Sequence, residues 1–214
     1  MIFSNTAVII GKTFEYNYQY EHYIKDATII VVLDSAIQQF LKLDLPIQPH
    51  VLLGDFDEQI DPEIVRKKFP GIAIVHTPDQ NKTDFEKAIE FLLEKGYKKI
   101  ISLGLTGRRM DHTFNNIATL GKYNDQAFIQ IIDDYSIIEC ISRVYNRKHK
   151  KGTRISLLPL GEVTGVITRN LKYSLMNESL ALGRRTGSSN EVAEDGEVVV
   201  TIGKGRLIVM ECWD

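Results

Sequence analysis

Four aspartates in two loops are the residues whose type and spacing most directly suggest chemistry. Asp55 and Asp57 follow the apolar run Val-Leu-Leu, and Asp79 and Asp84 follow the run Ile-Ala-Ile-Val. In an open α/β sheet, ligands bind just beyond the carboxyl ends of the parallel strands. Mg²⁺ takes one or two protein carboxylates and completes its coordination with water and substrate phosphates. Aspartate also favours loops for local reasons, but four acids at one edge predict a metal and phosphate site.

Asp34 ends a further apolar run, 28–33 (TIIVVL), whose β-branched composition is typical of a strand buried on both faces. Apolar residues at helical spacing follow at Ile37, Phe40 and Leu41, so a strand-to-helix turn is predicted at Asp34. Asp34 then either caps that helix or joins the acids at the sheet edge. The residues alone leave both roles open.

Capping residues mark where two helices are expected to begin. Asp61-Pro62 combines an N-cap acid with proline at the first helical position, so Asp61 is left out of the site. Thr83 and Glu86 have the spacing of a capping box. Asp84 lies between them, at the positive end of the helix dipole. Helix stabilisation and metal binding are therefore compatible roles for Asp84.

The run 104–112 (GLTGRRMDH) follows a predicted strand over 99–103 and precedes a helical pattern. Glycines at such a turn let the backbone approach a phosphate, and a helix N-terminus favours an anion. Arg108 and Arg109 add planar, permanently charged groups for phosphate oxygens. The Gly-Lys-Ser/Thr ending of a Walker A loop is absent, so a phosphate loop of another kind is predicted.

Two patterns divide the chain into predicted domains 1–135 and 136–214. In the first, strands over 7–10, 28–33, 99–103 and 127–132 alternate with helical patterns, which favours an α/β fold with a mostly parallel sheet. In the second, short apolar or alternating runs with glycine turns predict a small β-sandwich or barrel. Its expected strands span 137–141, 154–158, 165–168, 198–202 and 207–210. The basic run 143–151 is interpreted as a solvated hairpin or linker.

The composition is that of an ordinary soluble protein, with 43% hydrophobic and 25% charged residues in 214. A formal net charge of −2 argues against a nucleic-acid partner. No apolar run approaches the ~20 residues needed to cross a bilayer, and the N-terminus lacks the pattern of a signal peptide. Cys140 and Cys212 are isolated and predicted to be reduced and buried. We therefore expect a cytoplasmic protein without a membrane partner.

Five segments resemble the motifs of thiamine pyrophosphokinases. Three of them, 54–57 (GDFD), 77–84 (TPDQNKTD) and 107–112 (GRRMDH), resemble that family's N-terminal motifs. Two more, 171–175 (LKYSL) and 187–191 (GSSNE), resemble its thiamine-binding motifs. The resemblance implies a three-layer nucleotide-binding α/β domain followed by an antiparallel β-sandwich. It also implies a homodimer, with each active site between the first domain of one subunit and the sandwich of the other.

The resemblance assigns roles to the acids and to the phosphate loop. It makes Asp55, Asp57 and Asp84 catalytic residues and magnesium ligands. Catalytic roles also fall to Asp111 and Arg109. Further ATP- or thiamine-binding positions in the first domain are Asp34, Asp79, Gln80, Gly107 and Arg108.

Three residues of the second domain match positions that contact the vitamin. Tyr173 falls where the family places an aromatic residue against thiamine, and a cationic thiazolium beside an aromatic face is physically sensible. Read without the resemblance, Tyr173 is nearly as well explained as a core aromatic. Ser189 and Asn190 match the polar pair that contacts the vitamin, and alone they would indicate a turn.

The chain departs from the family pattern at two glycines. Ala36 follows Asp34-Ser35 where the family usually has glycine, and Arg108 replaces a glycine of the phosphate loop. Each missing glycine removes backbone freedom, so the contacts to ATP are expected to differ in detail.

The function predicted from all of these residues is transfer of the pyrophosphoryl group of ATP to the hydroxyethyl arm of thiamine, which releases AMP. Mg²⁺ is the expected cofactor, and ATP is the co-substrate. Two alternatives stay open. One is a pyrophosphokinase for another alcohol, such as a hydroxymethylpterin, and the other is a non-catalytic nucleotide or thiamine sensor.

Overall fold

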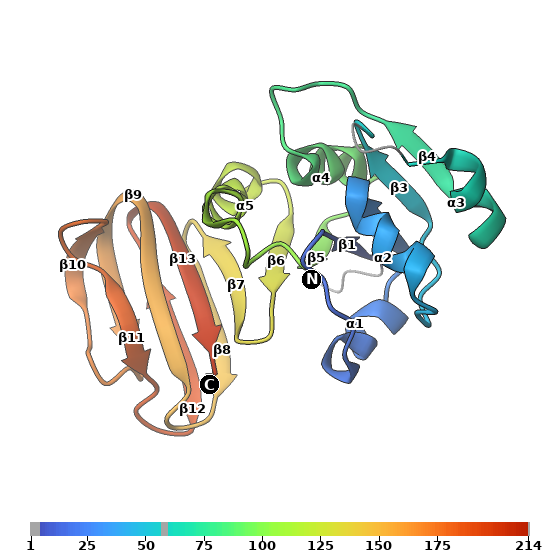
Figure 1. Cartoon of the computed structure of the whole chain (residues 1–214). Coiled ribbons are helices and arrows are strands. Elements are labelled where there is room, and N and C mark those ends of the chain that lie inside the picture. Colours follow the sequence, from blue (N-terminus) through green and yellow to red (C-terminus); the bar gives the residue numbers. More distant parts are fainter. Residues whose placement is uncertain (1–4, 57–59, 214) are drawn as a thin grey trace. The chain divides into compact units, whose positions relative to one another are not determined.

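The computed structural model of the chain describes residues 5–56 and 60–213 (Figure 1). The chain divides into two compact units. The first comprises Met1–Asn116 and Gln126–Ile129, and the second comprises Ile117–Asp125 and Gln130–Asp214. Each unit is described separately.

The first unit is built on a parallel sheet with the strand order β4-β3-β2-β1-β5. Every described pairing along this order is parallel, which confirms the predicted parallel sheet. The central strands are buried along almost their whole length, because their apolar side chains face helices on both sides. The strands are β1 (Thr6–Ile10), β2 (Ile29–Leu33), β3 (Val51–Gly54), β4 (Ala73–His76) and β5 (Lys99–Leu103).

Helices cover both faces of this sheet. The strand order runs outward from β1 to β4 and then returns to β5, so right-handed crossovers place α4 on the face opposite to α2. Figure 1 shows α2 and α4 on opposite sides of the strands. The helices are α1 (Glu21–Lys25), α2 (Ile37–Lys42), α3 (Pro62–Lys68), α4 (Asp84–Glu94) and α5 (Met110–Tyr123), with short 3₁₀ turns at Tyr18–Tyr20 and Asp34–Ala36.

Both predicted helix starts are confirmed. Asp61 Oδ1 accepts the backbone N–H of Glu63 at 2.9 Å, as expected of an N-cap. In the capping box, Thr83 Oγ1 accepts the Glu86 N–H and Glu86 Oε2 accepts the Thr83 N–H, each at 3.3 Å. The capping box therefore fixes where α4 begins, and α4 packs on β1, β2 and β3.

The second unit consists of antiparallel strands in two layers, and this part of the predicted fold is also confirmed. One layer joins β7, β13, the first half of β9 and β11. The other joins β8, β12, the second half of β9 and β10. β6 (Phe128–Ile132) belongs partly to each unit and pairs with β7. The other strands are β7 (Ser136–Ile141), β8 (Val144–His149), β9 (Arg154–Arg169), β10 (Met176–Ala181), β11 (Gly187–Glu191), β12 (Gly196–Thr201) and β13 (Lys204–Cys212).

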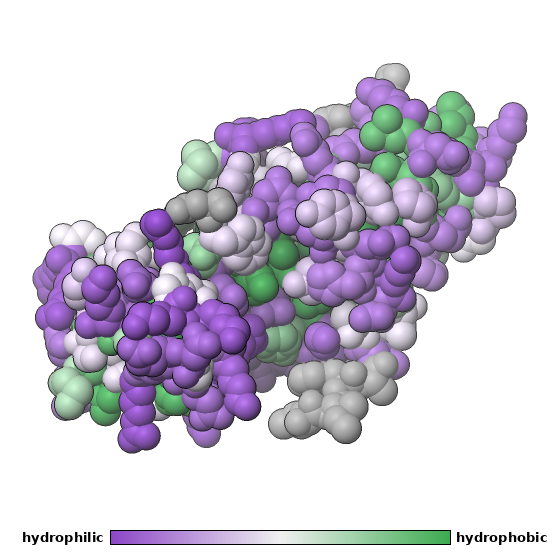
Figure 2. Space-filling view, turned by 90° about the horizontal axis from the view of Figure 1, so that it is seen from below, coloured by the Kyte–Doolittle hydropathy of each residue, from purple (hydrophilic) through white to green (hydrophobic). Residues whose placement is uncertain are grey.

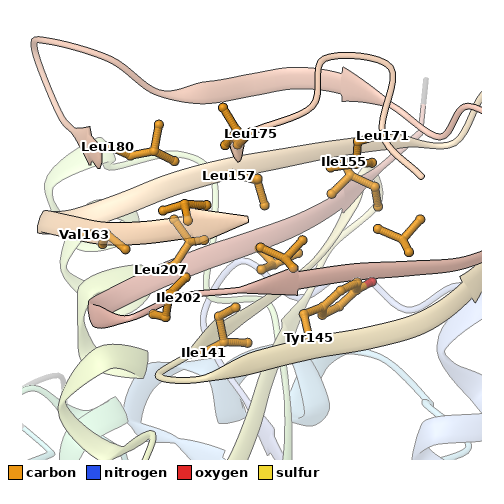
Figure 3. Packing of buried hydrophobic residues seen from close by; sticks show 14 of the residues in the cluster. Ile141, Tyr145, Ile155, Leu157, Val163, Leu171, Leu175, Leu180, Ile202 and Leu207 are labelled. Atoms are coloured by element: carbon orange, nitrogen blue, oxygen red, sulfur yellow. The ribbon is translucent and has the colours of Figure 1, made fainter. Parts of the chain in front are cut away.

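The core of this unit lies between its two layers. Buried aliphatic side chains such as Ile141, Leu157, Leu180 and Leu207 point toward one another there (Figure 3). Hydrophilic side chains cover most of the visible face of the unit, on the left of Figure 2. The alternation of inward apolar and outward polar residues is what the short sequence runs predicted.

Two expectations for the second unit are wrong. The strands predicted over 154–158 and 165–168 are a single 16-residue strand, β9, which passes from one layer to the other. The basic run 143–151 is not a linker, because most of it forms β8. Tyr145 of that run is 3% exposed and belongs to the core.

The two cysteines are free thiols, as predicted. Burial raises the pKa of the Cys140 thiol to about 12. Cys212 is only half-buried, contrary to the expectation that both are buried. In the described part of the chain, no helix is long and apolar enough to cross a membrane.

Candidate active site

A cavity of about 470 Å³ lies at the carboxyl edge of the parallel sheet, within the first unit. Loops after β1, β2, β3 and β5 form its walls together with the first turn of α4. This is the edge where the sequence places the acids and the phosphate loop. Charged and polar residues of the lining are Lys12, Thr13, Asp34, Ser35, Asp55, Lys82, Thr83, Asp84, Lys87, Arg108, Arg109, His112 and Asn116.

Three of the predicted acids, Asp34, Asp55 and Asp84, converge on this cavity from the turn after β2, the loop after β3 and the first turn of α4. Asp34 Oδ1 accepts the backbone N–H of Phe56 at 3.2 Å, which ties the turn after β2 to the loop after β3. Asp55 Oδ2 accepts Gln80 Nε2 at 3.0 Å. Asp57 lies outside the described residues.

Close backbone packing makes this convergence achievable. A Cβ atom on Gly54 would lie 2.7 Å from Cβ of Asp34, so only glycine lets β3 end beside that turn. Asp34 and Phe56 both adopt positive φ angles, 38° and 58°, which are uncommon for residues with side chains. Such local strain concentrates at functional sites.

Lys87, on α4, is a site residue that the sequence interpretation missed. Its side chain is 6% exposed, and Nζ donates to the carbonyl oxygen of Thr77 at 2.8 Å and to Asp84 Oδ1 at 3.4 Å. Nζ also lies 4.0 Å from Asp55 Oδ2. The i,i+3 spacing from Asp84 on a predicted helix is the signal that could have identified it.

The carboxyl of Asp84 has a raised pKa. Burial is the main cause, because it disfavours the charged form, and the neighbouring Asp34 and Asp55 act in the same direction. The ammonium of Lys87 opposes this shift. The acids of the cavity thus crowd one another, which is the electrostatic setting of a site that receives a cation.

The phosphate loop contributes cations and one flexible backbone position. Gly107 has a φ of 83°, and a Cβ there would meet no atom within 4 Å. Arg108 lines the cavity with a φ of 51°, a conformation that glycine adopts more readily. Arg109 forms an ion pair with Asp111, and both side chains are exposed. This pair lowers the pKa of Asp111 to about 2.

Some predicted residues of the first unit do not line the cavity. Asp111 is one of them. Asp79 is exposed and accepts hydrogen bonds from N and Nδ2 of Asn81 in its own turn, at 2.9 and 3.0 Å. These bonds, the backbone one first, lower the pKa of Asp79. Gln80 is also exposed and acts on the site through its bond to Asp55.

The predicted vitamin-binding residues lie in the second unit. Tyr173 is 63% exposed, so the alternative of a core aromatic is wrong. Asn190 is 3% exposed, and its side-chain amide accepts from the N–H of Tyr173 at 3.0 Å and donates to the C=O of Tyr173 at 2.8 Å. Ser189 has a φ of 56°, and its N–H donates to Ser156 Oγ at 3.0 Å. Asn190 therefore fixes the backbone that presents Tyr173.

The donor set of the cavity fits a hard divalent cation. Carboxylate oxygens are the ligands that Mg²⁺ prefers, and one or two of them suffice when phosphates complete the coordination. One ammonium already contacts both Asp55 and Asp84, so a cation can approach both carboxylates. Within 5–56 and 60–213, no group of three or more His, Cys, Asp or Glu side chains is placed to hold a metal ion by itself.

Comparisons with known proteins agree with this geometry. Residues 20–132 match the family model "Thiamin pyrophosphokinase, catalytic domain", and residues 142–207 match "Thiamin pyrophosphokinase, vitamin B1 binding domain". A thiamine pyrophosphokinase of Bacillus subtilis is 30% identical over 198 residues, which cover 90% of this chain and 91% of that protein. A thiamin pyrophosphokinase of Caenorhabditis elegans is 27% identical over 175 residues, 76% of this chain and 70% of the relative.

Solved structures of thiamine pyrophosphokinases are also similar to this chain. The crystal structure of thiamine pyrophosphokinase from Bacillus subtilis superposes with a TM-score of 0.83 at 26% identity, covering 98% of this chain and 100% of that one. The thiamin pyrophosphokinase from Candida albicans has a TM-score of 0.81 at 18% identity over 97% of this chain and 90% of that one, a likeness of fold.

Proposed function

Because this chain belongs to the thiamine pyrophosphokinase family, we infer that it transfers the pyrophosphoryl group of ATP to the hydroxyethyl arm of thiamine, giving thiamine diphosphate and AMP. The structural observation that carries this inference is the cavity that gathers carboxylates and cations at one sheet edge. Reactions of this kind depend mainly on positioning and charge neutralisation. The comparisons lend no support to a pterin pyrophosphokinase or a sensor.

Asp55 and Asp84 are proposed to hold Mg²⁺, with Asp57 as a further ligand and Asp34 as a neighbouring acid. Mg²⁺ bound there would neutralise phosphate charge and orient the transferred group. Asp34 supports the arrangement because its carboxylate holds the backbone of Phe56, next to Asp55. Gln80 orients Asp55 from the other side.

The phosphates of ATP are proposed to lie along the phosphate loop. Arg108, Lys12 and Lys82 line the cavity and can bind non-bridging oxygens. In the reaction, the hydroxyl oxygen of thiamine forms a bond to the β-phosphorus, and its proton passes to a carboxylate of the cavity. The bond from that phosphorus to the oxygen bridging to the α-phosphorus breaks, and AMP leaves with that oxygen.

Thiamine is proposed to bind against Tyr173, in a domain 136–214 that follows an ATP-binding domain 1–135. The ring of Tyr173 is exposed, and an aromatic face attracts the cationic thiazolium. Ser189 adds a backbone turn beside Asn190. The free thiols of Cys140 and Cys212 support a cytoplasmic location.

We further propose a homodimer in which Tyr173 of one subunit serves the cavity of the other. Mixed dimers test this. Asp55→Asn and Tyr173→Ala chains, each poorly active alone at low thiamine, should regain about one quarter of wild-type activity when their subunits pair at random, because such hybrids contain one intact site. If both residues serve a site within one chain, mixing restores nothing.

Product analysis tests the reaction itself. The protein is incubated with thiamine, ATP and Mg²⁺, and the nucleotides are separated by anion exchange. Equal amounts of AMP and thiamine diphosphate are expected. ADP with thiamine monophosphate would instead indicate attack at the γ-phosphorus and would contradict the proposed transfer.

A further inference from the structure

Lys87 is unusual among the cations of the cavity because it is buried. It is 7% exposed, whereas Lys12 and Arg108 are exposed and Lys82 is half-buried. Lysine is rarely buried unless its ammonium is paired, since desolvating an unpaired charge is costly. The position of this side chain therefore depends on the partners that it finds in the cavity.

Those partners fix the ammonium between two acids. The hydrogen bond to the carbonyl oxygen of Thr77, at 2.8 Å, anchors Nζ to the backbone just after β4. From this anchor Nζ reaches Asp84 Oδ1 at 3.4 Å and Asp55 Oδ2 at 4.0 Å. Because the anchor is a backbone atom, the ammonium stays beside the carboxylates when a ligand enters.

We propose that Lys87 is an internal counter-ion that weakens divalent-cation binding at Asp55 and Asp84 until ATP is present, an inference that rests on the metal-binding role proposed for those acids. The fixed ammonium repels an incoming cation and shares the carboxylates with it. The triphosphate supplies the negative charge that reverses this balance. The cation then enters with the nucleotide and is released more readily once AMP has left.

Removing the charge of Lys87 should therefore strengthen the binding of a divalent cation, whereas removing an acid should weaken it. Repulsion between two unit charges 4 Å apart lowers a binding constant by about a factor of five even at the dielectric constant of water. For a divalent cation the repulsion energy is twice as large. We expect neutral variants of Lys87 to bind a divalent cation about 10-fold more tightly or better in the absence of nucleotide. Turnover should fall, because release of the cation with product becomes slower.

The test measures Mn²⁺ binding by electron paramagnetic resonance in nucleotide-free protein. Lys87→Met removes the charge, and Lys87→Gln removes it while keeping a donor for Thr77. Lys95→Met, on an exposed lysine at the end of α4, is the matched control and should bind Mn²⁺ as the wild type does. Melting temperatures measured in EDTA establish whether each variant is folded. If Lys87→Met does not fold, Lys87→Gln carries the test.

A non-hydrolysable ATP analogue supplies the second measurement. The analogue should strengthen Mn²⁺ binding strongly in wild type and much less in the Lys87 variants, because their sites no longer need the triphosphate charge. Unchanged or weaker Mn²⁺ binding without nucleotide in both variants would overturn the proposal. Failure of the proposed function would show separately, as absence of thiamine-dependent AMP from the wild-type protein.

Discussion

The two units hold their candidate binding residues in different ways. In the first unit, Asp55, Asp84 and the buried Lys87 line one cavity and constrain one another directly. In the second unit, the ring of Tyr173 is exposed, and Lys172 Nζ lies over it at 5.8 Å from the ring centroid. The backbone of Tyr173 is held by Asn190, whose buried amide bonds both of its polar groups.

This difference matches the ligands that are proposed for each part. Phosphates and metal ions need several charges brought to one place, so the side chains themselves must meet. A flat cation needs only one aromatic face, so it is enough to fix the backbone that carries it. Several motif residues of the first unit line the cavity themselves, whereas Asn190 supports the backbone of Tyr173.

The largest expected effect is the loss of a cavity acid. Asp55→Asn should lower turnover by about 10²-fold or more, because a charge that the site needs is removed while the fold is kept. The protein without metal should be at least as stable, since crowding of carboxylates is relieved. Asp79→Asn is the control, because Asp79 is exposed and bonded within its own turn, and a few-fold change is expected. Steady-state kinetics and a thermal melt in EDTA measure both, and near-wild-type turnover of Asp55→Asn would end this assignment.

Asn190→Ala probes the supporting residue of the second unit. It leaves the N–H and C=O of Tyr173 without their partners, at a cost of about 1–3 kcal/mol in unfolding free energy. The KM for thiamine should rise while the KM for ATP stays constant. Asn190→Asp retains the acceptor but places a buried carboxylate oxygen against the C=O of Tyr173, so it should be at least as destabilising. In a double-mutant cycle with Tyr173→Ala the effects on thiamine should be strongly non-additive, whereas additive effects would mean that Asn190 contacts the vitamin itself.

Tyr173→Ala should weaken thiamine binding by about 0.5–2 kcal/mol, the usual contribution of a cation–π contact. Stability should change little, because the ring is 63% exposed. Tyr173→Trp keeps an aromatic face and is the matched control. Isothermal titration with thiamine and, separately, with an ATP analogue measures the two affinities. Equal losses of affinity for both ligands would mean that Tyr173 does not bind the vitamin specifically.

The fold of the first unit was largely predictable, and that of the second only in part. β5 has the predicted bounds, because a continuous apolar run between turn residues leaves little choice. In β9, Pro159, Gly161 and Gly165 read as breakers, but the strand changes layers there and the two glycines take positive φ angles. β11 (GSSNE) was missed as a strand, because its sequence has no alternation of apolar and polar residues.

The residues of the candidate site also differ in how well the sequence predicts them. Asp34, Asp55 and Asp84 were predictable because strand ends of a parallel sheet share one edge. Lys87 was not, because its burial depends on Thr77 and Asp55, which are distant in sequence. The division at residue 135 and the roles taken from the family resemblance stay predictions.

Two buried serines, one in each unit, allow the units to be compared by the stability of Ser→Ala variants. Ser102 in β5 is fully buried, and among the described residues its hydroxyl has no hydrogen-bond partner. Ser102→Ala should therefore raise the unfolding free energy by about 1 kcal/mol, or Tm by about 2–4 °C. Ser136→Ala in the second unit should do the reverse, because its hydroxyl donates to Asp133 Oδ1 at 2.9 Å. Calorimetry of both variants decides the point, and destabilisation by Ser102→Ala would reveal a partner.

The smallest expected effect concerns Asp111, which the family resemblance makes catalytic but which lies outside the lining of the cavity. Its pKa of about 2 in the folded protein is below the ordinary value of 3.8. The ion pair with Arg109 therefore adds stability above pH 4, and this contribution disappears as the pH falls toward 2. Both side chains are exposed, so salt screens the pair and Asp111→Asn should change Tm very little at neutral pH.

The turnover of Asp111→Asn should fall far less than that of Asp55→Asn, because the variant leaves every acid of the cavity in place. A loss as large as that of Asp55→Asn, measured at the same Mg²⁺ concentration, would return Asp111 to the catalytic group.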